Sequence, residues 1–188
     1  MVKDPNVLPD GLPVPEDDGA AGHLAGMRLP DIRLASTAGD RVDLAALNGT
    51  AVLYLYPMTG RPGVALPDGW DGIAGARGCT PQSCAFRDHF SDLQALGVDH
   101  LFGISAQNTD YQREAKDRLH LPFDLLSDAA GALRDALDLP VFEVEGMVLL
   151  KRMAIIAREG VIENVLYPVF PPDRNAADVI DWLSAQRP

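Results

Sequence analysis

The sequence predicts an α/β protein with a mixed β-sheet flanked by helices. Residues 51–56 form a continuous apolar run of β-rich composition, which is typical of a central strand buried on both faces. Strand-like and helix-like segments then alternate between residues 98 and 137. A predicted hairpin at 147–167 and a terminal helix at 175–186 complete a sheet that has helices on its faces.

The N-terminal segment is predicted to be an arm outside the domain. Residues 1–26 contain four prolines and five acidic residues, a composition typical of an extended chain that is disordered or laid along the surface. A partner-binding segment is the alternative. Residues 27–188 then form one domain, which opens with a β-hairpin made by residues 27–34 and 41–44.

The only two cysteines, Cys79 and Cys84, lie at the start of a predicted helix. Pro81 suits a first helical turn, where a missing N–H costs nothing. Unpaired N–H groups and the helix dipole favour a thiolate at Cys79 and give Cys84 no such help. Apolar residues at helical spacing extend this helix to residue 96: Phe86, Phe90, Leu93 and Leu96.

The spacing of the two cysteines limits how they can react with each other. Five residues along an α-helix separate the Cα atoms by about 8.6 Å. A disulfide needs about 4.4–6.8 Å. The pair therefore cannot bridge in an intact helix, and a redox-active pair requires the first turns to unwind. The alternative is that both are small buried hydrophobic residues.

The remaining elements follow in a regular order. Asn108 is expected to cap a helix that runs to Leu119. The other predicted elements are a strand at 98–105, a short strand and turn at 122–128, a short helix at 129–137, and strands at 147–157 and 161–167 joined by a turn at 159–160.

Four segments together resemble the peroxiredoxin family, most closely its bacterioferritin-comigratory or Q-type branch. They are residues 54–57 (Tyr-Leu-Tyr-Pro), 78–80 (Gly-Cys-Thr), 84–88 (Cys-Ala-Phe-Arg-Asp) and 123–128 (Phe-Asp-Leu-Leu-Ser-Asp). The resemblance implies a thioredoxin-like fold. It also implies that Cys79 is the peroxidatic cysteine and that Cys84 is the resolving cysteine, which pair in an intramolecular disulfide.

The resemblance also implies an active-site cation and a substrate-binding loop. The cation comes from the strand at 147–157, where Arg152 matches best and Lys151 is the alternative. Pro57 takes the position of the family's proline. The family's threonine has no counterpart in place, so Thr59 or another donor is expected to supply its hydroxyl. Arg87 matches the branch's Arg-Asp pair, with a surface salt bridge as the alternative.

The connection at residues 58–78 is longer than in the family. It holds six glycines and two prolines and is predicted to be a long loop. One interpretation is a tolerated surface insertion. The other is a lid over the thiol, anchored by Trp70.

Composition narrows the function. A net charge of −11 without a basic cluster argues against nucleic acid and anionic membranes as partners. The sequence has neither a transmembrane-length apolar run nor a signal-peptide pattern, and two cysteines suit a reducing, cytoplasmic setting. No metal site is expected from the scattered histidines.

The predicted activity is a thiol peroxidase. By the resemblance, the chain is a monomer that reduces hydrogen peroxide and organic hydroperoxides, is recycled by thioredoxin and needs no prosthetic group. A disulfide reductase is disfavoured because Cys-x-x-Cys is absent. A redox sensor or interaction protein that oxidises once without cycling is the alternative from another class.

Overall fold

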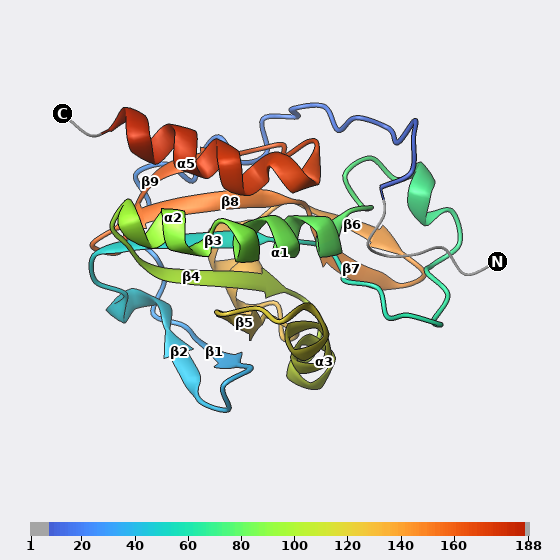
Figure 1. Ribbon diagram of the computed structural model, residues 1–188, viewed down its shortest axis with the longest axis horizontal. Coiled ribbons are helices and arrows are strands. Elements are labelled where there is room, and N and C mark those ends of the chain that lie inside the picture. Colours follow the sequence, from blue (N-terminus) through green and yellow to red (C-terminus); the bar gives the residue numbers. More distant parts are fainter. Residues whose placement is uncertain (1–7, 187–188) are drawn as a thin grey trace.

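A computed structural model describes residues 8–186 and contains a seven-stranded mixed sheet with helices on both faces (Figure 1). The strand order is β2-β1-β5-β4-β3-β8-β9. The neighbours β3, β4 and β5 run parallel, and the other pairs are antiparallel. The predicted α/β class, mixed sheet and N-terminal hairpin are thus confirmed.

The elements have the following bounds. The strands of the main sheet are β1 (Arg33–Ser36), β2 (Arg41–Asp43), β3 (Thr50–Leu55), β4 (Val98–Ser105), β5 (Asp124–Ser127), β8 (Met153–Arg158) and β9 (Val161–Leu166). The α-helices are α1 (Cys79–Asp88), α2 (Phe90–Ala95), α3 (Thr109–Leu119), α4 (Ala132–Leu137) and α5 (Asn175–Ala185). None of the helices within residues 8–186 is long and apolar enough to cross a bilayer.

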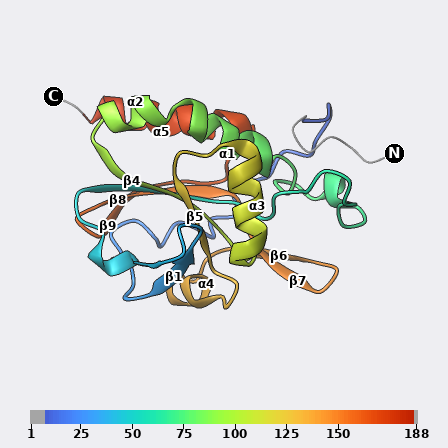
Figure 2. The ribbon, with the colours of Figure 1, turned by 60° about the horizontal axis from the view of Figure 1, so that its bottom comes forward.

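Strand β3 is buried on both faces and separates two apolar cores. Leu53 and Leu55 point into one core, with residues of the N-terminal arm and α4. Val52 and Tyr54 point into the other, with residues of α1, α2, α3 and α5. Figure 2 shows α1, α2 and α5 on one side of the sheet and α4 on the other. The alternation of a strand's side chains therefore explains why the whole run is apolar.

The predicted helix at 79–96 is two helices. Helix α1 ends at Asp88, and α2 begins at Phe90. His89 between them has φ −98° and ψ 11°, outside the helical region. Phe86 and Leu93, one from each helix, are nevertheless buried in the same core. The break therefore preserves the apolar face that the spacing predicted.

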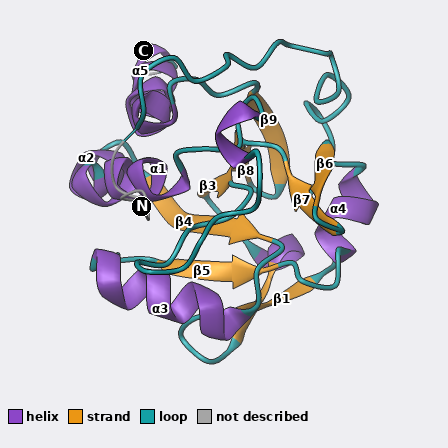
Figure 3. Ribbon diagram, turned by 90° about the vertical axis from the view of Figure 1, so that its right-hand side faces the viewer, coloured by secondary structure: helices purple, strands orange, loops and turns teal. Residues whose placement is uncertain are grey.

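The predicted single strand at 147–157 was wrong. Strand β7 (Met147–Leu150) pairs with β6 (Val141–Val144), which the sequence analysis did not anticipate, in a separate two-stranded sheet (Figure 3). Strand β8 of the main sheet begins only at Met153. Lys151 and Arg152 therefore lie at the junction of two sheets rather than inside a strand, and the Lys151 N–H donates to the Pro140 carbonyl at 2.9 Å.

The long connection at 58–78 packs against the β6–β7 hairpin. Trp70 begins a short 3-10 helix, η2 (Trp70–Gly72), and its ring centroid lies 6.0 Å from that of Phe142. Trp70 also shares a small apolar core with Ala76 and Leu149. The Asp68 N–H donates to the Glu145 side chain at 2.9 Å. This segment is consequently held in place by a core of its own.

Residues 8–26 of the predicted arm run along the domain, and part of this segment packs into its core. Ala21 and Leu24 are buried in the core on the α4 face. The Asp18 carboxylate accepts hydrogen bonds from Lys151 Nζ at 2.6 Å and Tyr167 Oη at 2.8 Å. These two bonds lower the pKa of Asp18 below its usual value. Residues 1–7 of the arm lie outside the described residues.

Removing the Trp70 side chain should destabilise the protein. Trp70→Ala is expected to lower the free energy of unfolding by about 3 kcal/mol, because a large buried aromatic ring leaves a cavity. Val64→Ala is the matched control in the same segment, since Val64 is 53% exposed, and it should change stability by less than about 0.5 kcal/mol. Urea unfolding checks both values. Equal stabilities of the two variants would contradict the anchoring role of Trp70.

Candidate active site

Cys79 is the first residue of α1, and the glycine before it fixes where the helix begins. Gly78 caps the helix with φ 107°, a left-handed conformation that favours glycine. A Cβ at this position would also lie 2.2 Å from Cγ of Pro172. Cys79 itself is only 3% exposed. Backbone conformation and space both require glycine here, and together they place the sulfur at the helix N-terminus, as predicted.

Two donors and one acceptor surround the Cys79 sulfur. Arg152 Nη2 lies 3.2 Å from Sγ, and the Met58 N–H donates to it at 3.4 Å. The Ala76 carbonyl is 3.6 Å away and accepts from the thiol. Both donors can stabilise negative charge that develops on the sulfur, and the guanidinium brings a full positive charge.

Pro57 contributes through the backbone. Proline has no N–H of its own, and it directly precedes the Met58 N–H that reaches the sulfur. Pro57 follows the end of β3, and α/β sheets generally bind ligands beyond the carboxyl ends of their strands. The structure therefore brings the Pro57 segment and Cys79 together.

The Arg152 guanidinium is buried and held on several sides. Its side chain is among the buried polar groups, at 3% exposure. Nη2 donates to three consecutive backbone carbonyls, those of residues 75–77, at 3.1–3.2 Å. Nη1 donates to Gln82 Oε1. The last residues of the long connection at 58–78 thus position the cation at the sulfur.

Lys151 takes a different position from its neighbour. Its ammonium group pairs with Asp18 of the arm at 2.6 Å. Of the two cations considered from the sequence, the structure therefore places Arg152, and not Lys151, beside Cys79.

Gln82 and Asn175 are two further residues near the site, and neither was predicted from the sequence. Both side chains are fully buried, and Gln82 Nε2 donates to Asn175 Oδ1 at 2.8 Å. Gln82 was detectable in principle, because it lies three residues after Cys79 and so shares its helix face. Asn175 lies 93 residues further along the chain and gave no local signal.

The Thr59 side chain is hydrogen-bonded to Gln107. Its hydroxyl donates to Gln107 Oε1 at 3.1 Å, and its backbone N–H donates to the same oxygen at 3.0 Å. Gln107 Nε2 in turn donates to the Thr59 carbonyl at 3.2 Å. Thr59 is thus bonded to the loop that precedes α3. Within residues 8–186, the donors to the Cys79 sulfur are the Met58 N–H and Arg152, so the substrate-binding role expected for Thr59 stays a prediction.

A small pocket opens at the sulfur. Six of its eight lining residues, Leu66 and Trp70 among them, come from the long connection, and the other two, Cys79 and Thr80, come from α1. The connection therefore forms part of the wall of the site, as the lid interpretation requires.

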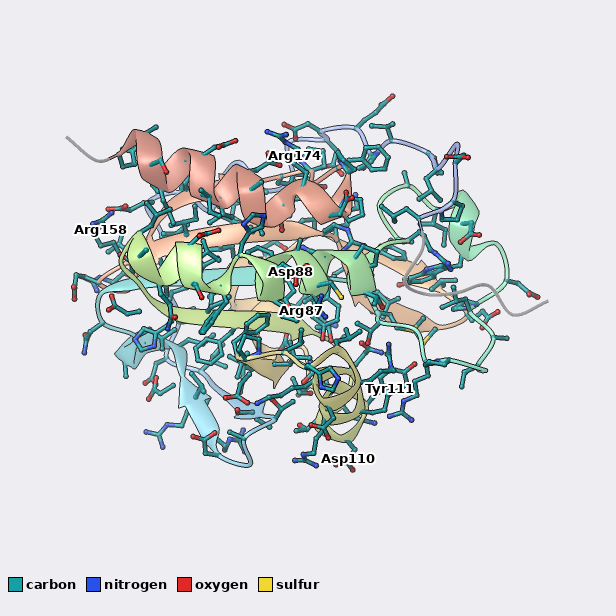
Figure 4. All side chains as sticks on the ribbon, in the orientation of Figure 1. Arg87, Asp88, Asp110, Tyr111, Arg158 and Arg174 are labelled. Carbon is teal, nitrogen blue, oxygen red and sulfur yellow. The ribbon has the colours of Figure 1, made fainter. Side chains whose placement is uncertain are left out.

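Cys84 lies in a different environment. It is partly buried, and this burial raises the pKa of its thiol, while the Arg87 guanidinium opposes the shift. Arg87 donates to Asp88 at 2.8 Å and to the Leu119 carbonyl at 2.9 Å, and Figure 4 shows Arg87 and Asp88 at the end of α1. Arg87 thus makes a surface salt bridge and also acts electrostatically on Cys84. Both cysteines are free thiols.

The histidines and acidic residues do not assemble around this site. Across the described residues, no three His, Cys, Asp or Glu side chains are grouped so that they would hold a metal ion.

Comparison with known proteins identifies the family. The sequence model described as Redoxin matches residues 24–180. The chain is 26% identical over 161 residues to peroxiredoxin Q, chloroplastic, of Oryza sativa subsp. japonica, and the match covers 85% of this chain and 66% of that protein. The corresponding protein of Suaeda salsa is also 26% identical over 161 residues, with 85% and 67% covered. The chain thus spans slightly less than two thirds of the rice protein.

Solved structures share the fold. Peroxidoxin BcpB from Mycobacterium tuberculosis superposes with a TM-score of 0.69 at 22% identity and covers 87% of this chain and 98% of its own. Peroxiredoxin Q from Xanthomonas campestris gives a TM-score of 0.68 at 22% identity, with 86% and 98% covered. The chain therefore belongs to the redoxin family, and it is similar in sequence and in fold to Q-type peroxiredoxins.

Proposed function

We propose that this protein is a thiol peroxidase that reduces hydrogen peroxide and organic hydroperoxides. The observation that carries the proposal is the 3.2 Å contact between Cys79 Sγ and the buried Arg152 guanidinium at the N-terminus of α1. A title among the related structures describes alkyl peroxide reduction by the Xanthomonas campestris bacterioferritin comigratory protein, which supports the same chemistry.

In the first step, the Cys79 thiolate attacks one peroxide oxygen. The O–O bond breaks, sulfur becomes a sulfenic acid, and the other oxygen leaves as water or an alcohol after it takes a proton. Negative charge moves from sulfur toward the leaving oxygen. Fixed donors stabilise this movement, and the Arg152 guanidinium and the Met58 N–H are the donors already aimed at the reacting sulfur.

In the second step, the Cys84 thiol attacks the sulfenic sulfur, releases water and forms an intramolecular disulfide. The helical separation of about 8.6 Å between the Cα atoms exceeds disulfide range, so the first turns of α1 must open. An external dithiol protein such as thioredoxin then reduces the disulfide by exchange. We further propose that the chain works as a monomeric antioxidant enzyme in a reducing compartment such as the cytoplasm, without nucleic-acid or membrane partners.

Substitution of each cysteine separates the two steps. Cys79→Ser should abolish peroxide consumption, because the attacking atom is lost. Cys84→Ser should keep the first oxidation and block cycling with thioredoxin. Peroxide consumption over many equivalents is the measurement, and full turnover by Cys79→Ser would reject the mechanism. Consumption that stops after one equivalent in the unmodified protein would instead indicate a non-cycling redox sensor.

Arg152 and its neighbour Lys151 provide a matched pair. Arg152→Met should slow oxidation of Cys79 by about 10²–10³-fold, because a preorganised donor to the reacting atoms is lost. Lys151→Met should change the rate less than about threefold, because Lys151 binds Asp18 at the surface. Stopped-flow oxidation with hydrogen peroxide measures both rates. Similar losses in the two variants would refute a specific role for Arg152.

Ionisation of Cys84 should depend on Arg87. Burial raises the pKa of Cys84 and Arg87 lowers it, so Arg87→Met should raise it further and leave less thiolate at a given pH. In a Cys79→Ser background, alkylation of Cys84 by iodoacetamide should then become slower at pH 8, and its pH profile should move upward. Arg113→Met, which removes an exposed arginine of α3, is the control. An unchanged profile in Arg87→Met would show that Arg87 only binds Asp88.

A further inference from the structure

A buried pair of amides connects the C-terminal helix to the active site. Gln82 on α1 and Asn175, the first residue of α5, are both 0% exposed. Gln82 Nε2 donates to Asn175 Oδ1 at 2.8 Å, while Gln82 Oε1 accepts from Arg152. A hydrogen-bonded chain thus runs from Asn175 through Gln82 and Arg152 to the Cys79 sulfur.

The two ends of the Gln82 amide are not interchangeable. A guanidinium has only donors, so the amide must turn its oxygen toward Arg152. A flip of the amide would place its NH2 group against the guanidinium. Two hydrogen-bond donors would then face each other with no acceptor between them. The Asn175 oxygen prevents this, because it accepts only from the NH2 end.

Within the described part of the chain, the Asn175 amide forms a hydrogen bond through its oxygen and none through its nitrogen. Its Nδ2 is buried and has no hydrogen-bond partner among residues 8–186. A buried amide that is only half satisfied is a poor choice for packing alone, and leucine has a similar size without that cost. The oxygen is therefore the functional part of this side chain.

The segment that precedes Asn175 packs against the N-terminal end of α1. Pro172, in the 3-10 helix η3 (Pro172–Arg174) that precedes α5, lies so close to Gly78 that a Cβ there would meet it. Asn175 is thus supported by packing at the same end of α1 that holds Cys79. Such support gives a hydrogen-bond partner a fixed position.

We propose that Asn175 is a positioning residue for the active site: it fixes the orientation of the Gln82 amide, and thereby keeps Arg152 on the Cys79 sulfur and the thiol ionised. This inference rests on the proposed role of Arg152 as the stabiliser of the thiolate. It concerns ionisation of the thiol, so it holds or fails separately from peroxide turnover.

The test measures alkylation of Cys79 by iodoacetamide between pH 5 and 9 in a Cys84→Ser background, where only one thiol reacts. Asn175→Leu should slow alkylation at pH 6 by about three- to tenfold and move the profile upward, because a buried donor of Gln82 loses its acceptor. In a Gln82→Glu background, Asn175→Leu should slow alkylation much less: the logarithm of the fold-change should be less than half of its value with Gln82 present. A carboxylate has two equivalent oxygens and no orientation to fix.

Two controls separate positioning from simple destabilisation. Ser184→Ala, on the exposed side of α5, should leave the alkylation profile unchanged. Urea unfolding of Asn175→Leu reports its structural effect, and if that variant does not fold, Asn175→Ala carries the test because it also removes the acceptor. An unchanged profile would overturn the proposal. A slowing of the same size with and without Gln82→Glu would also overturn it, because Asn175 would not then act through the amide.

Discussion

The buried guanidinium of Arg152 is the group on which the rest of the site depends. A charge taken out of water is costly unless other groups compensate it. Here the compensation comes from the carbonyls of residues 75–77, the Gln82 amide and the Cys79 sulfur. Among the described residues, no carboxylate forms an ion pair with Arg152, so a Cys79 thiolate is its only counter-ion within hydrogen-bond distance.

Three segments that lie far apart in the sequence are needed to hold this cation. The long connection at 58–78 provides the carbonyls and is itself anchored by Trp70 on the β6–β7 hairpin. The junction between β7 and β8 points Arg152 inward, and the adjacent Lys151 holds the N-terminal arm. The start of α5 contributes Asn175. In the proposed reaction, oxidation of Cys79 to an uncharged sulfenic acid would remove the negative charge beside Arg152. The buried guanidinium would then be less well compensated than in the reduced protein.

The sequence predicted features that depend on neighbouring residues and missed those that depend on distant ones. The apolar run of β3, the Asn108 cap of α3, whose oxygen accepts from the Tyr111 N–H at 2.8 Å, and the turn at 159–160 are local signals. So is the position of Cys79 at a helix N-terminus. The junction at Lys151 and Arg152 was missed because β7 follows a partner, β6, whose pattern is short and partly exposed. The role expected for Thr59 stays a prediction, and its hydrogen bond to Gln107, on another loop, gave no local signal in the sequence.

The interruption at His89 has a consequence for the motion that the proposed Cys79–Cys84 disulfide would need. Because α1 and α2 are separate, loss of the first turns of α1 does not have to propagate along a single cooperative rod. Leu93 in α2 is buried in the same core as Val179 of α5. This packing holds α2 on the sheet independently of the first turns of α1. In the proposed cycle, the rearrangement would therefore be limited to the ten residues of α1, and the remainder of the domain would keep its packing.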